Sequence, residues 1–434
     1  MERPKPKTIE NNYASPRWTG EILDCALPMS LDQFSRCSFD CLYCFSYFQR
    51  IKSTIMKKTS EKMKVPYLQR PPASINVAKT IDMFTGKRKT PFSQYIARRT
   101  PFQWGGLSDP FDLFEKRYGV GLEIMQVLYK MKYPICFSTK GTWILDDDRY
   151  ASLFHNNSFW NVKVSIINLD ESKARLMERG VASPEKRLEF MRRLSLHQGT
   201  GVTLRLRPFI IGFSDENNAH IELIQKAGQA GADAVSTEFL CVEGRLTSGI
   251  VDRYDQMSKI MQNNLYEFYR KNTIIPMGYM RLNWKIKKKF IDEMEIAAKK
   301  AGLRFYVSDA HHKDRSCNGC CCGLPESWEY HRGQFTQALL IAKEKGTVAW
   351  SDIEPFIFPE YAEQSIVAGC GLNIGRRTVN SRAQFKDLSI KDYIKMMWND
   401  TSKTQNPYNY FFGLLQPLKL DNDKNIIYQY VPYS

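Results

Sequence analysis

Apolar and polar positions between residues 100 and 310 follow two alternating patterns. Short runs typical of buried strands are separated by stretches in which apolar residues recur every three or four positions, as on one face of a helix. The strand-like runs are Phe102–Gly106, Ile135–Ser138, Val162–Ile166, Val202–Pro208, Ala232–Thr237 and Leu303–Val307. Strands separated by single helices predict βαβ units, a parallel sheet and right-handed crossovers.

About six or seven such units predict an α/β fold, a partial (β/α)6-type barrel, with a doubly wound sheet as the alternative. The repeat stops after His311, and the rest of the chain ends in a tail rich in Tyr, Phe and Asn. We therefore expect a barrel over residues 1–310 and a C-terminal region over residues 311–434.

Composition agrees with a globular protein, because 43% of the 434 residues are hydrophobic and 25% are charged. No stretch approaches the ~18 apolar residues of a membrane helix, and the first residues lack the apolar run of a signal peptide. We expect a cytoplasmic protein without a membrane partner. The oligomeric state is not predicted.

The net charge of +16 is concentrated in one segment. Residues 50–100 contain thirteen Lys and Arg against Glu61 and Asp82, with aromatic residues interleaved, as on a surface that binds nucleic acid. The candidate contacts are Lys87, Arg88, Lys89, Arg98 and Arg99. Because the segment precedes the Phe102–Gly106 strand, we expect it to border the mouth of the active site. A solvated insertion is the alternative.

Seven of the eleven cysteines fall in two clusters, which in a reducing compartment indicates metal binding rather than disulfides. The first cluster is Cys37, Cys41 and Cys44. A short loop with this spacing can place three thiolates on one face of a [4Fe–4S] cube and leave one iron open, whereas structural zinc takes four closed ligands. Zinc or scattered core cysteines are the alternatives. Cys25 could close the site as a fourth ligand, but we interpret it as a packed thiol.

This loop resembles the hallmark of the radical S-adenosylmethionine (radical SAM) superfamily, and the downstream motifs resemble its spore photoproduct lyase-like branch, a group of DNA repair enzymes. The similarity covers about residues 30 to 245. The motifs, in order, are Trp104–Pro110, Phe137–Lys140, Val164–Ile166, Met177–Gly180 with Ser183, Pro184 and Arg187, and Arg207–Ile210.

The resemblance implies an enzyme in which a reduced [4Fe–4S] cluster cleaves SAM and the resulting radical takes a substrate hydrogen. It implies an external electron donor of the flavodoxin or ferredoxin type. Whether the enzyme is a lyase, an isomerase or a transferase is not predicted. The SAM-binding residues that it implies are Tyr43, Gly105, Gly106, Ser108, Asp109, Lys140 and Ser165. Independently, Asp109, Lys140 and Ser165 lie near the carboxyl ends of predicted strands, where parallel barrels build active sites.

One feature departs from the lyase. A cysteine that returns hydrogen to the product radical precedes the Ser-Asp pair in the lyase, and Gly106 or Leu107 stands there in this chain. Cys241 is a candidate for a replacement hydrogen donor. The alternative is a thiol that only packs in the core.

The second cluster comprises Cys317, Cys320, Cys321 and Cys322. It could ligate an auxiliary Fe–S cluster, or zinc with help from a neighbouring histidine. Because adjacent side chains diverge, we expect Cys317, Cys320 and one of the last pair to ligate, with Cys370 as a distant completion. A packed cysteine-rich loop is the alternative.

Three functional hypotheses follow. The first is a radical SAM enzyme that modifies or repairs a nucleic acid base or nucleotide, with DNA or RNA as its partner. The second is a radical SAM enzyme that acts on a peptide or small metabolite and uses an auxiliary metal centre. The third is a non-catalytic Fe–S or zinc protein that binds nucleic acid.

Overall fold

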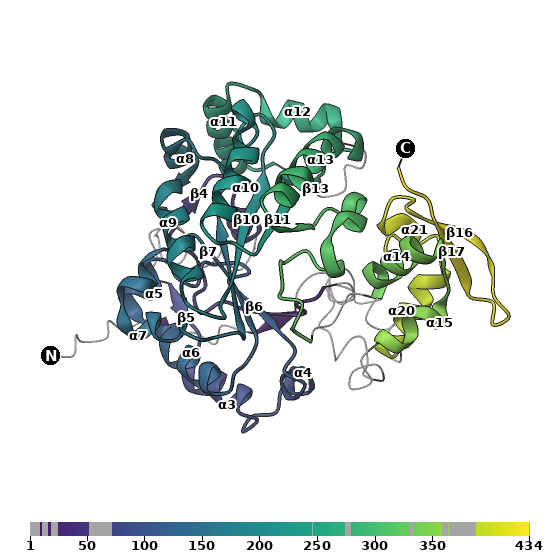
Figure 1. Ribbon diagram of the computed structural model, residues 1–434, viewed down its shortest axis with the longest axis horizontal. Helices are drawn as coiled ribbons and strands as arrows, with labels where there is room; N and C mark the ends of the chain where they lie inside the picture. Colours follow the sequence, from purple (N-terminus) through teal and green to yellow (C-terminus); the bar gives the residue numbers. More distant parts are fainter. Residues whose placement is uncertain are drawn as a thin grey trace.

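The computed structural model describes residues 9–10, 16–18, 25–51, 72–244, 246–273, 279–329, 334–357, 363 and 388–433. A central sheet is surrounded by helices, and a smaller group of C-terminal elements lies to one side (Figure 1).

The central sheet has eight strands in the order β14-β11-β10-β8-β7-β6-β3-β2. Seven of them are parallel to their neighbours, and β2 runs antiparallel to β3. The strands are β2 (Arg17–Trp18), β3 (Met29–Leu31), β6 (Phe102–Trp104), β7 (Ile135–Thr139), β8 (Trp160–Ser165), β10 (Gly201–Phe209), β11 (Ala234–Phe239) and β14 (Arg304–Val307).

Strand order decides between the two predicted architectures. Spatial order follows chain order from β3 to β14, so every crossover steps in the same direction. A doubly wound sheet would reverse direction at a switch point. The predicted partial barrel is therefore confirmed, and β3 adds a strand that the sequence pattern did not predict.

The helices follow the predicted positions and begin at recognisable caps. At α9, for example, Ser183 accepts a hydrogen bond from the Lys186 amide, and Pro184 occupies the first turn. The main barrel helices are α1 (Phe45–Ile51), α3 (Val77–Phe84), α4 (Ser93–Ala97), α5 (Leu113–Tyr118), α6 (Val120–Lys130), α7 (Asp148–Ala151), α8 (Glu171–Met177), α9 (Pro184–Ser195), α10 (Ala219–Gln229), α11 (Ser248–Met261), α12 (Leu265–Asn272) and α13 (Trp284–Lys300).

The two faces of β10 differ in polarity. Val202, Leu204 and Leu206 are buried in the main hydrophobic core. Arg205 and Arg207 alternate with them and so point to the opposite face. The barrel interior therefore carries charge along β10, whereas Cys136 and Tyr306 belong to a second, smaller apolar group.

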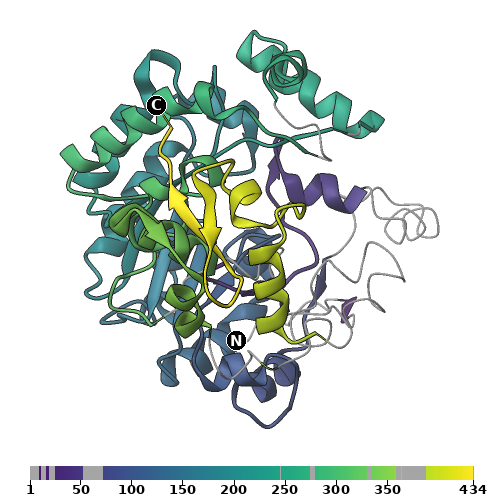
Figure 2. The same cartoon turned by 90° about the vertical axis from the view of Figure 1, so that its right-hand side faces the viewer.

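The C-terminal elements pack around Trp398, which contacts Trp350 and Tyr428 and belongs to the same hydrophobic core as the barrel. Its elements are α14 (Gln334–Lys345), β15 (Thr347–Val348), α15 (Trp350–Ile353), α20 (Ile390–Asn399), α21 (Pro407–Tyr410), β16 (Leu415–Leu420) and β17 (Ile426–Tyr430), and its sheet order is β15-β17-β16. Figure 2 shows these elements lying over one side of the barrel.

Stacking and a hydrogen bond attach this region to the barrel. Tyr433 stacks on Trp284 with ring centroids 4.3 Å apart, and the Tyr430 hydroxyl lies 2.7 Å from a carboxylate oxygen of Asp314. A division between residues 310 and 311 stays a prediction, although Ser316 also hydrogen-bonds the Val307 amide of β14.

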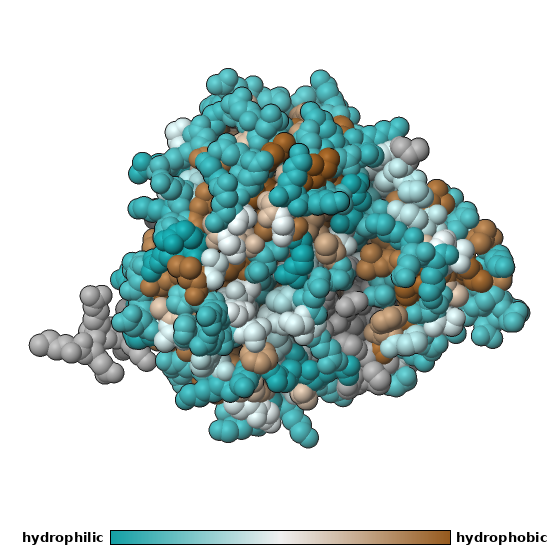
Figure 3. Space-filling model, in the orientation of Figure 1, coloured by the Kyte–Doolittle hydropathy of each residue, from teal (hydrophilic) through white to brown (hydrophobic). Residues whose placement is uncertain are grey.

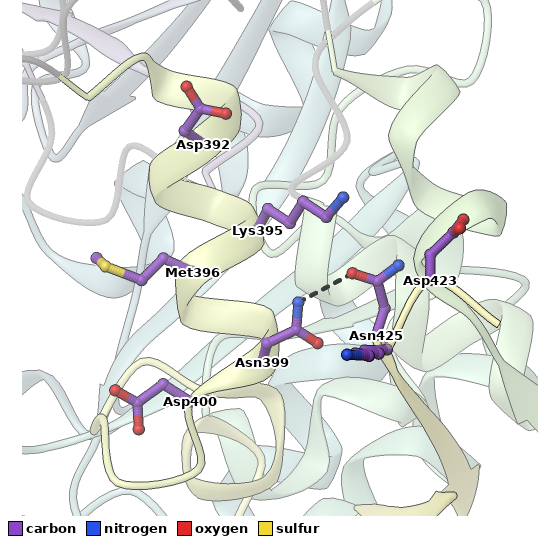
Figure 4. Close-up of a pocket in the computed structure, with 8 residues that line it drawn as sticks. Asp392, Lys395, Met396, Asn399, Asp400, Asp423 and Asn425 are labelled. Atoms are coloured by element: carbon purple, nitrogen blue, oxygen red, sulfur yellow. Dashed lines mark hydrogen bonds between the residues drawn. The ribbon is translucent and has the colours of Figure 1, made fainter. Parts of the chain in front are cut away.

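The surface adds little to the functional picture. The face in Figure 3 is mainly hydrophilic, with small groups of apolar side chains. An open hollow between α20 and the turn before β17 is lined by Lys395 and Asp423, among others, and the Asn399 amide donates to Asn425 across 3.0 Å (Figure 4). Within the described ranges, no helix combines the length and apolar character needed to cross a bilayer.

Gly141 tests how closely the strand-end loops pack. A Cβ there would lie 2.0 Å from the Phe111 carbonyl oxygen. We expect Gly141→Ala to lower the free energy of unfolding by at least about 2 kcal/mol, because backbone cannot yield as a side chain can. Gly302→Ala is the control. Gly302 has φ +71° with nothing within 4 Å of the added carbon, so its cost is about 1 kcal/mol of backbone strain. Urea unfolding measures both, and equal losses would contradict this packing.

Candidate active site

The first cysteine loop lies at the carboxyl end of the parallel sheet. Its strand β4 (Asp40–Cys41) pairs antiparallel with β9 (Glu178–Arg179), which follows the β8 crossover helix. The Leu42 amide also donates to the Met177 carbonyl across 2.9 Å. The Met177–Gly180 motif therefore serves as the strand on which the cysteine loop docks.

Two further contacts hold the loop in place. The Ser38 amide donates to Asp112, at 2.6 Å, in the segment that follows β6. Arg253, from α11, donates to the Cys41 carbonyl across 2.9 Å and pairs with Asp40. The same guanidinium lies 3.7 Å from the centre of the Tyr47 ring. The loop is thus anchored from three different elements.

Of the three cysteines, Cys41 is buried, and Cys37 and Cys44 are half-buried. Burial raises the pKa of Cys37 and raises that of Cys41 to about 12. Cys37 Sγ lies 3.4 Å from the Phe39 amide, which donates to it. In the described part of the chain, no three His, Cys, Asp or Glu side chains are placed to hold a single metal ion. The spacing of three cysteines in one loop fits a [4Fe–4S] cluster, in which each thiolate binds its own iron. The cluster stays a prediction.

A buried carboxylate, Glu178, joins the loop to the barrel. It accepts a hydrogen bond from the Tyr43 hydroxyl, and its other oxygen lies 2.7 Å from Arg187 Nη2. Lys140 Nζ lies 4.0 Å from Glu178 and 5.7 Å from the centre of the Tyr43 ring. Burial disfavours the ammonium, but Cys41 and Glu178 outweigh burial and raise the pKa of Lys140. Lys140 is thus a cation beside the cysteine loop.

Ser165 also lies in this polar group. Its carbonyl accepts from Arg187 across 2.6 Å, and its hydroxyl lies 3.3 Å from Arg205 Nη1. The structure therefore brings Tyr43, Lys140 and Ser165 together, at the carboxyl ends of β7 and β8. Their roles in SAM binding stay predictions.

The described contacts of the Gly105–Asp109 segment mainly hold it against neighbouring strands and loops. A Cβ on Gly105, at φ +91°, would lie 2.8 Å from the Ser138 carbonyl oxygen, and one on Gly106 would lie 3.1 Å from Ser30 Oγ. Ser108 bonds Asp32 through both its amide, at 2.7 Å, and its hydroxyl, at 3.0 Å. The two glycines therefore permit close approach of neighbouring atoms to the backbone. Ser108 already has a hydrogen-bond partner in Asp32.

Asp109 is engaged as well. Its carboxylate accepts from the Thr139 hydroxyl and the Lys140 amide, both at 2.6 Å, and from the Phe111 amide at 2.9 Å. These bonds tie the end of β6 to the end of β7. They give Asp109 a positioning role, beside which the predicted contact with the SAM amino group remains a prediction.

Sequence reasoning missed the roles of Asp32, Glu178 and Arg205. Glu178 stood in a quoted motif without a function, and Asp32 follows directly after the unpredicted strand β3. Burial lowers the pKa of Arg205 to about 10, and neighbouring Arg207 acts in the same direction. An alternation of charged and apolar residues in a strand as long as β10 is the signal that could have identified Arg205 and Arg207 as interior residues.

Cys241 follows β11 at the same end of the barrel. Burial raises the pKa of its thiol to about 12, while the charge of Arg281 acts to lower it. Its role as a hydrogen donor stays a prediction.

The described basic residues lie elsewhere. Arg99 donates to the Lys132 carbonyl, just before β7, and packs 5.4 Å from the centre of the Phe159 ring, just before β8. Arg98 pairs with Glu329 across 3.2 Å. Lys87, Arg88 and Lys89 are exposed in the preceding turn. These contacts are at the amino ends of the strands, and Figure 1 shows α4 at the opposite end from α8 and β4.

The prediction that this segment borders the active-site mouth is therefore wrong for Lys87, Arg88, Lys89, Arg98 and Arg99. The reason is topological, because the chain must return to the amino end before it enters β6. Residues 52–71 of the basic segment, and Cys370, lie outside the described residues.

The second cysteine cluster lies inside the barrel. Cys320 and Cys322 are buried with Cys136 of β7, Ala234 of β11 and Tyr306 of β14, and Cys25, Cys317 and Cys321 pack against this group. Cys25 Sγ lies 3.3 Å from the Leu27 carbonyl, in agreement with its interpretation as a packed thiol.

Comparison with known proteins places this geometry among solved structures. No family model matches the chain, and no curated protein matches it. Spore photoproduct lyase complexed with dinucleoside spore photoproduct aligns at a TM-score of 0.47 and 16% identity, over 68% of this chain and 81% of that one. A variant of that lyase with bound AdoMet and the dinucleoside aligns at 0.46 and 17%, over 65% and 76%.

Streptococcus suis SuiB bound to precursor peptide SuiA aligns at a TM-score of 0.39 and 10% identity, over 68% of this chain and 52% of that one. The likeness in all three cases is one of fold. The lyase structures bear the name of the branch that the sequence motifs resemble.

The buried carboxylate can be tested directly. We expect Glu178→Gln to lower the free energy of unfolding by about 3 kcal/mol, because it leaves the buried Arg187 without its anion. Glu189→Gln is the matched control, since Glu189 pairs with Arg192 on the exposed face of α9. It should leave stability unchanged within error. Equal effects in thermal unfolding would contradict the anchoring role of Glu178.

Proposed function

We propose that this protein is a radical SAM enzyme in which Cys37, Cys41 and Cys44 hold a [4Fe–4S] cluster with one open iron. The observation that carries the proposal is the pairing of β4 with β9, which docks the cysteine loop over the carboxyl end of a parallel partial barrel. A loop that only filled a core would not need anchors from Asp112, Glu178 and Arg253.

When bound, the cluster and SAM supply an electron and a 5′-deoxyadenosyl radical that removes a hydrogen atom from the substrate. The chain's own residues bind and orient. Lys140 is a cation held beside Cys41 and suits the carboxylate of SAM. Ser165 suits a hydroxyl or a carboxylate, and Tyr43 provides an aromatic surface for the adenine. Gly105 allows close approach of backbone to the ligand.

We propose a nucleic acid base or nucleotide as the substrate class, supported by the motif resemblance and by the net charge of +16. The interior cations Arg205 and Arg207 suit an anionic substrate. A peptide or small metabolite is the second candidate, favoured by the position of Lys87–Lys89 and Arg98–Arg99 at the amino end, away from the cysteine loop. An external electron donor of the flavodoxin or ferredoxin type would reduce the cluster.

SAM cleavage is the first test. We expect the reconstituted protein, incubated anaerobically with dithionite and SAM, to produce 5′-deoxyadenosine and methionine, measured by liquid chromatography. Cys41→Ala should abolish both products, because the cube loses one of its three protein ligands. Cys25→Ala is the matched control and should keep them. No product from the wild type would exclude an enzyme of this class, and loss in Cys25→Ala would make Cys25 a fourth ligand.

Nucleic acid binding is tested by salt dependence. We expect the logarithm of the binding constant for DNA or RNA to fall linearly with the logarithm of the salt concentration. Replacement of Lys87, Arg88 and Lys89 by Gln should reduce the slope by about 2 to 3, since each lost phosphate contact removes about 0.9. SAM cleavage should stay unchanged, because these residues are remote from the cysteine loop. Deuterium transfer from labelled nucleic acid to 5′-deoxyadenosine would identify the substrate. Absence of binding at low salt would favour a peptide or metabolite.

A further inference from the structure

The segment after β14 folds back into the barrel and partly fills it. The Ser236 hydroxyl of β11 donates to the Cys321 carbonyl across 2.7 Å, and the indole of Trp328 donates to the Ser158 carbonyl before β8 across 2.8 Å. Gly323, at φ +68°, packs so closely that a Cβ would lie 2.7 Å from the side chain of Thr203. The loop is therefore held by three strands or their connections, and its position is well defined.

This insertion gathers four thiols in one place. Cys321 Sγ and Cys322 Sγ lie 3.7 Å apart, and Cys320 Sγ accepts the Cys322 amide across 3.1 Å. Cys136 belongs to the same buried group, and it comes from β7, more than 180 residues earlier in the chain. Its thiol lies 3.4 Å from the Asn161 amide nitrogen, which donates to it.

Sequence reasoning argued that adjacent cysteines diverge, and the structure corrects this for Cys321 and Cys322. Their sulfur separation of 3.7 Å is close to the edge of a thiolate tetrahedron around zinc, which is about 3.8 Å for bonds of about 2.3 Å. Cys317, which the sequence predicts as a ligand, packs against the group as Cys321 does, but no sulfur contact joins it to the other thiols in the described part of the chain.

Charge gives a second, independent observation. Lys163 is buried beside Cys136, and its ammonium lies 2.6 Å from the Gln103 side-chain oxygen. Arg205, whose electrostatic neighbours include Cys322, is half-buried and bonds the Ser165 hydroxyl. In the described part of the chain, neither cation forms an ion pair with a carboxylate. A buried cation such as Lys163 is destabilising without a counterion. Thiols become anions when they ligate a metal, so a thiolate centre would supply the missing negative charge.

We propose that Cys136, Cys320, Cys321 and Cys322 form a second, thiolate-ligated metal centre inside the barrel. It is separate from the cluster at Cys37, Cys41 and Cys44. Four thiolates suit either zinc or an iron–sulfur cluster, both of which prefer sulfur ligands. No three of the side chains converge on one point in the structure, so binding would draw the thiols together around the metal. Lys163 and Arg205 would balance the charge of the centre.

The test removes the first site and counts metal at the second. In a variant with Cys37, Cys41 and Cys44 all replaced by Ala, we expect zinc, or iron with sulfide, to remain after purification and anaerobic reconstitution, measured by inductively coupled plasma mass spectrometry. Further replacement of Cys136 and Cys322 by Ser should remove that metal. Cys241→Ser in the same background is the matched control and should keep it. The readout is metal content, so it is independent of SAM cleavage.

Cobalt(II) gives a second measurement that does not require changes at Cys136. The triple Ala variant loaded with cobalt should show thiolate-to-cobalt charge-transfer absorption, which reports sulfur ligation. Either zinc or iron–sulfur content supports the proposal and identifies the centre. Absence of metal in the folded triple variant together with absence of the cobalt band would overturn it, as would full metal retention after loss of Cys136 and Cys322.

Discussion

The ion pair between Glu178 and Arg187 is the constraint on which the arrangement of the candidate site depends. Both side chains are buried, so their charges are removed from water and must satisfy each other. Arg187 is fixed by α9 and by the Ser165 carbonyl, while Glu178 lies in the strand that pairs with the cysteine loop. One buried pair therefore fixes three things together: the end of β8, helix α9 and the loop that carries the three thiols.

Pairing of charges also explains how charged residues can lie inside the barrel. The apolar side chains of β10 pack on the outer face of the sheet, under the helices, and the charged side chains of this strand lie on the inner face. Such an interior is stable only when each charge has a partner. Arg207 has Glu238, and Arg187 has Glu178. Lys163 instead lies beside Cys136 of the cysteine-rich group and, in the described part of the chain, forms no ion pair with a carboxylate.

Local patterns in the sequence predicted much of the fold. Alternation identified six of the seven parallel strands, because period-two patterns reflect burial that each strand experiences separately, but the order of the strands in the sheet came from the structure. β3 has three residues and too little alternation to be recognised. The spacing of Cys37, Cys41 and Cys44 could be recognised in the sequence because all three cysteines lie in one loop. The role of Glu178 and the association of Cys136 with Cys322 could not be predicted, because they depend on contacts between residues far apart in the chain.

The location of the basic residues in the fold was the property that the sequence predicted least well. A basic segment between the cysteine loop and β6 seemed to border the catalytic end, yet a parallel strand must be entered from its amino end, so Lys87–Lys89 and Arg98–Arg99 lie at the other end of the barrel. The positive charge near the cysteine loop comes instead from separate residues on successive strands and helices, Lys140, Arg187 and Arg205. An anionic ligand that reaches the interior would meet these fixed cations, of which Arg187 is buried and the other two are half-buried, so salt screens them weakly. The exposed basic residues act at long range and lose their effect as salt rises. Salt dependence of binding and salt dependence of chemistry therefore report on opposite ends of the same barrel.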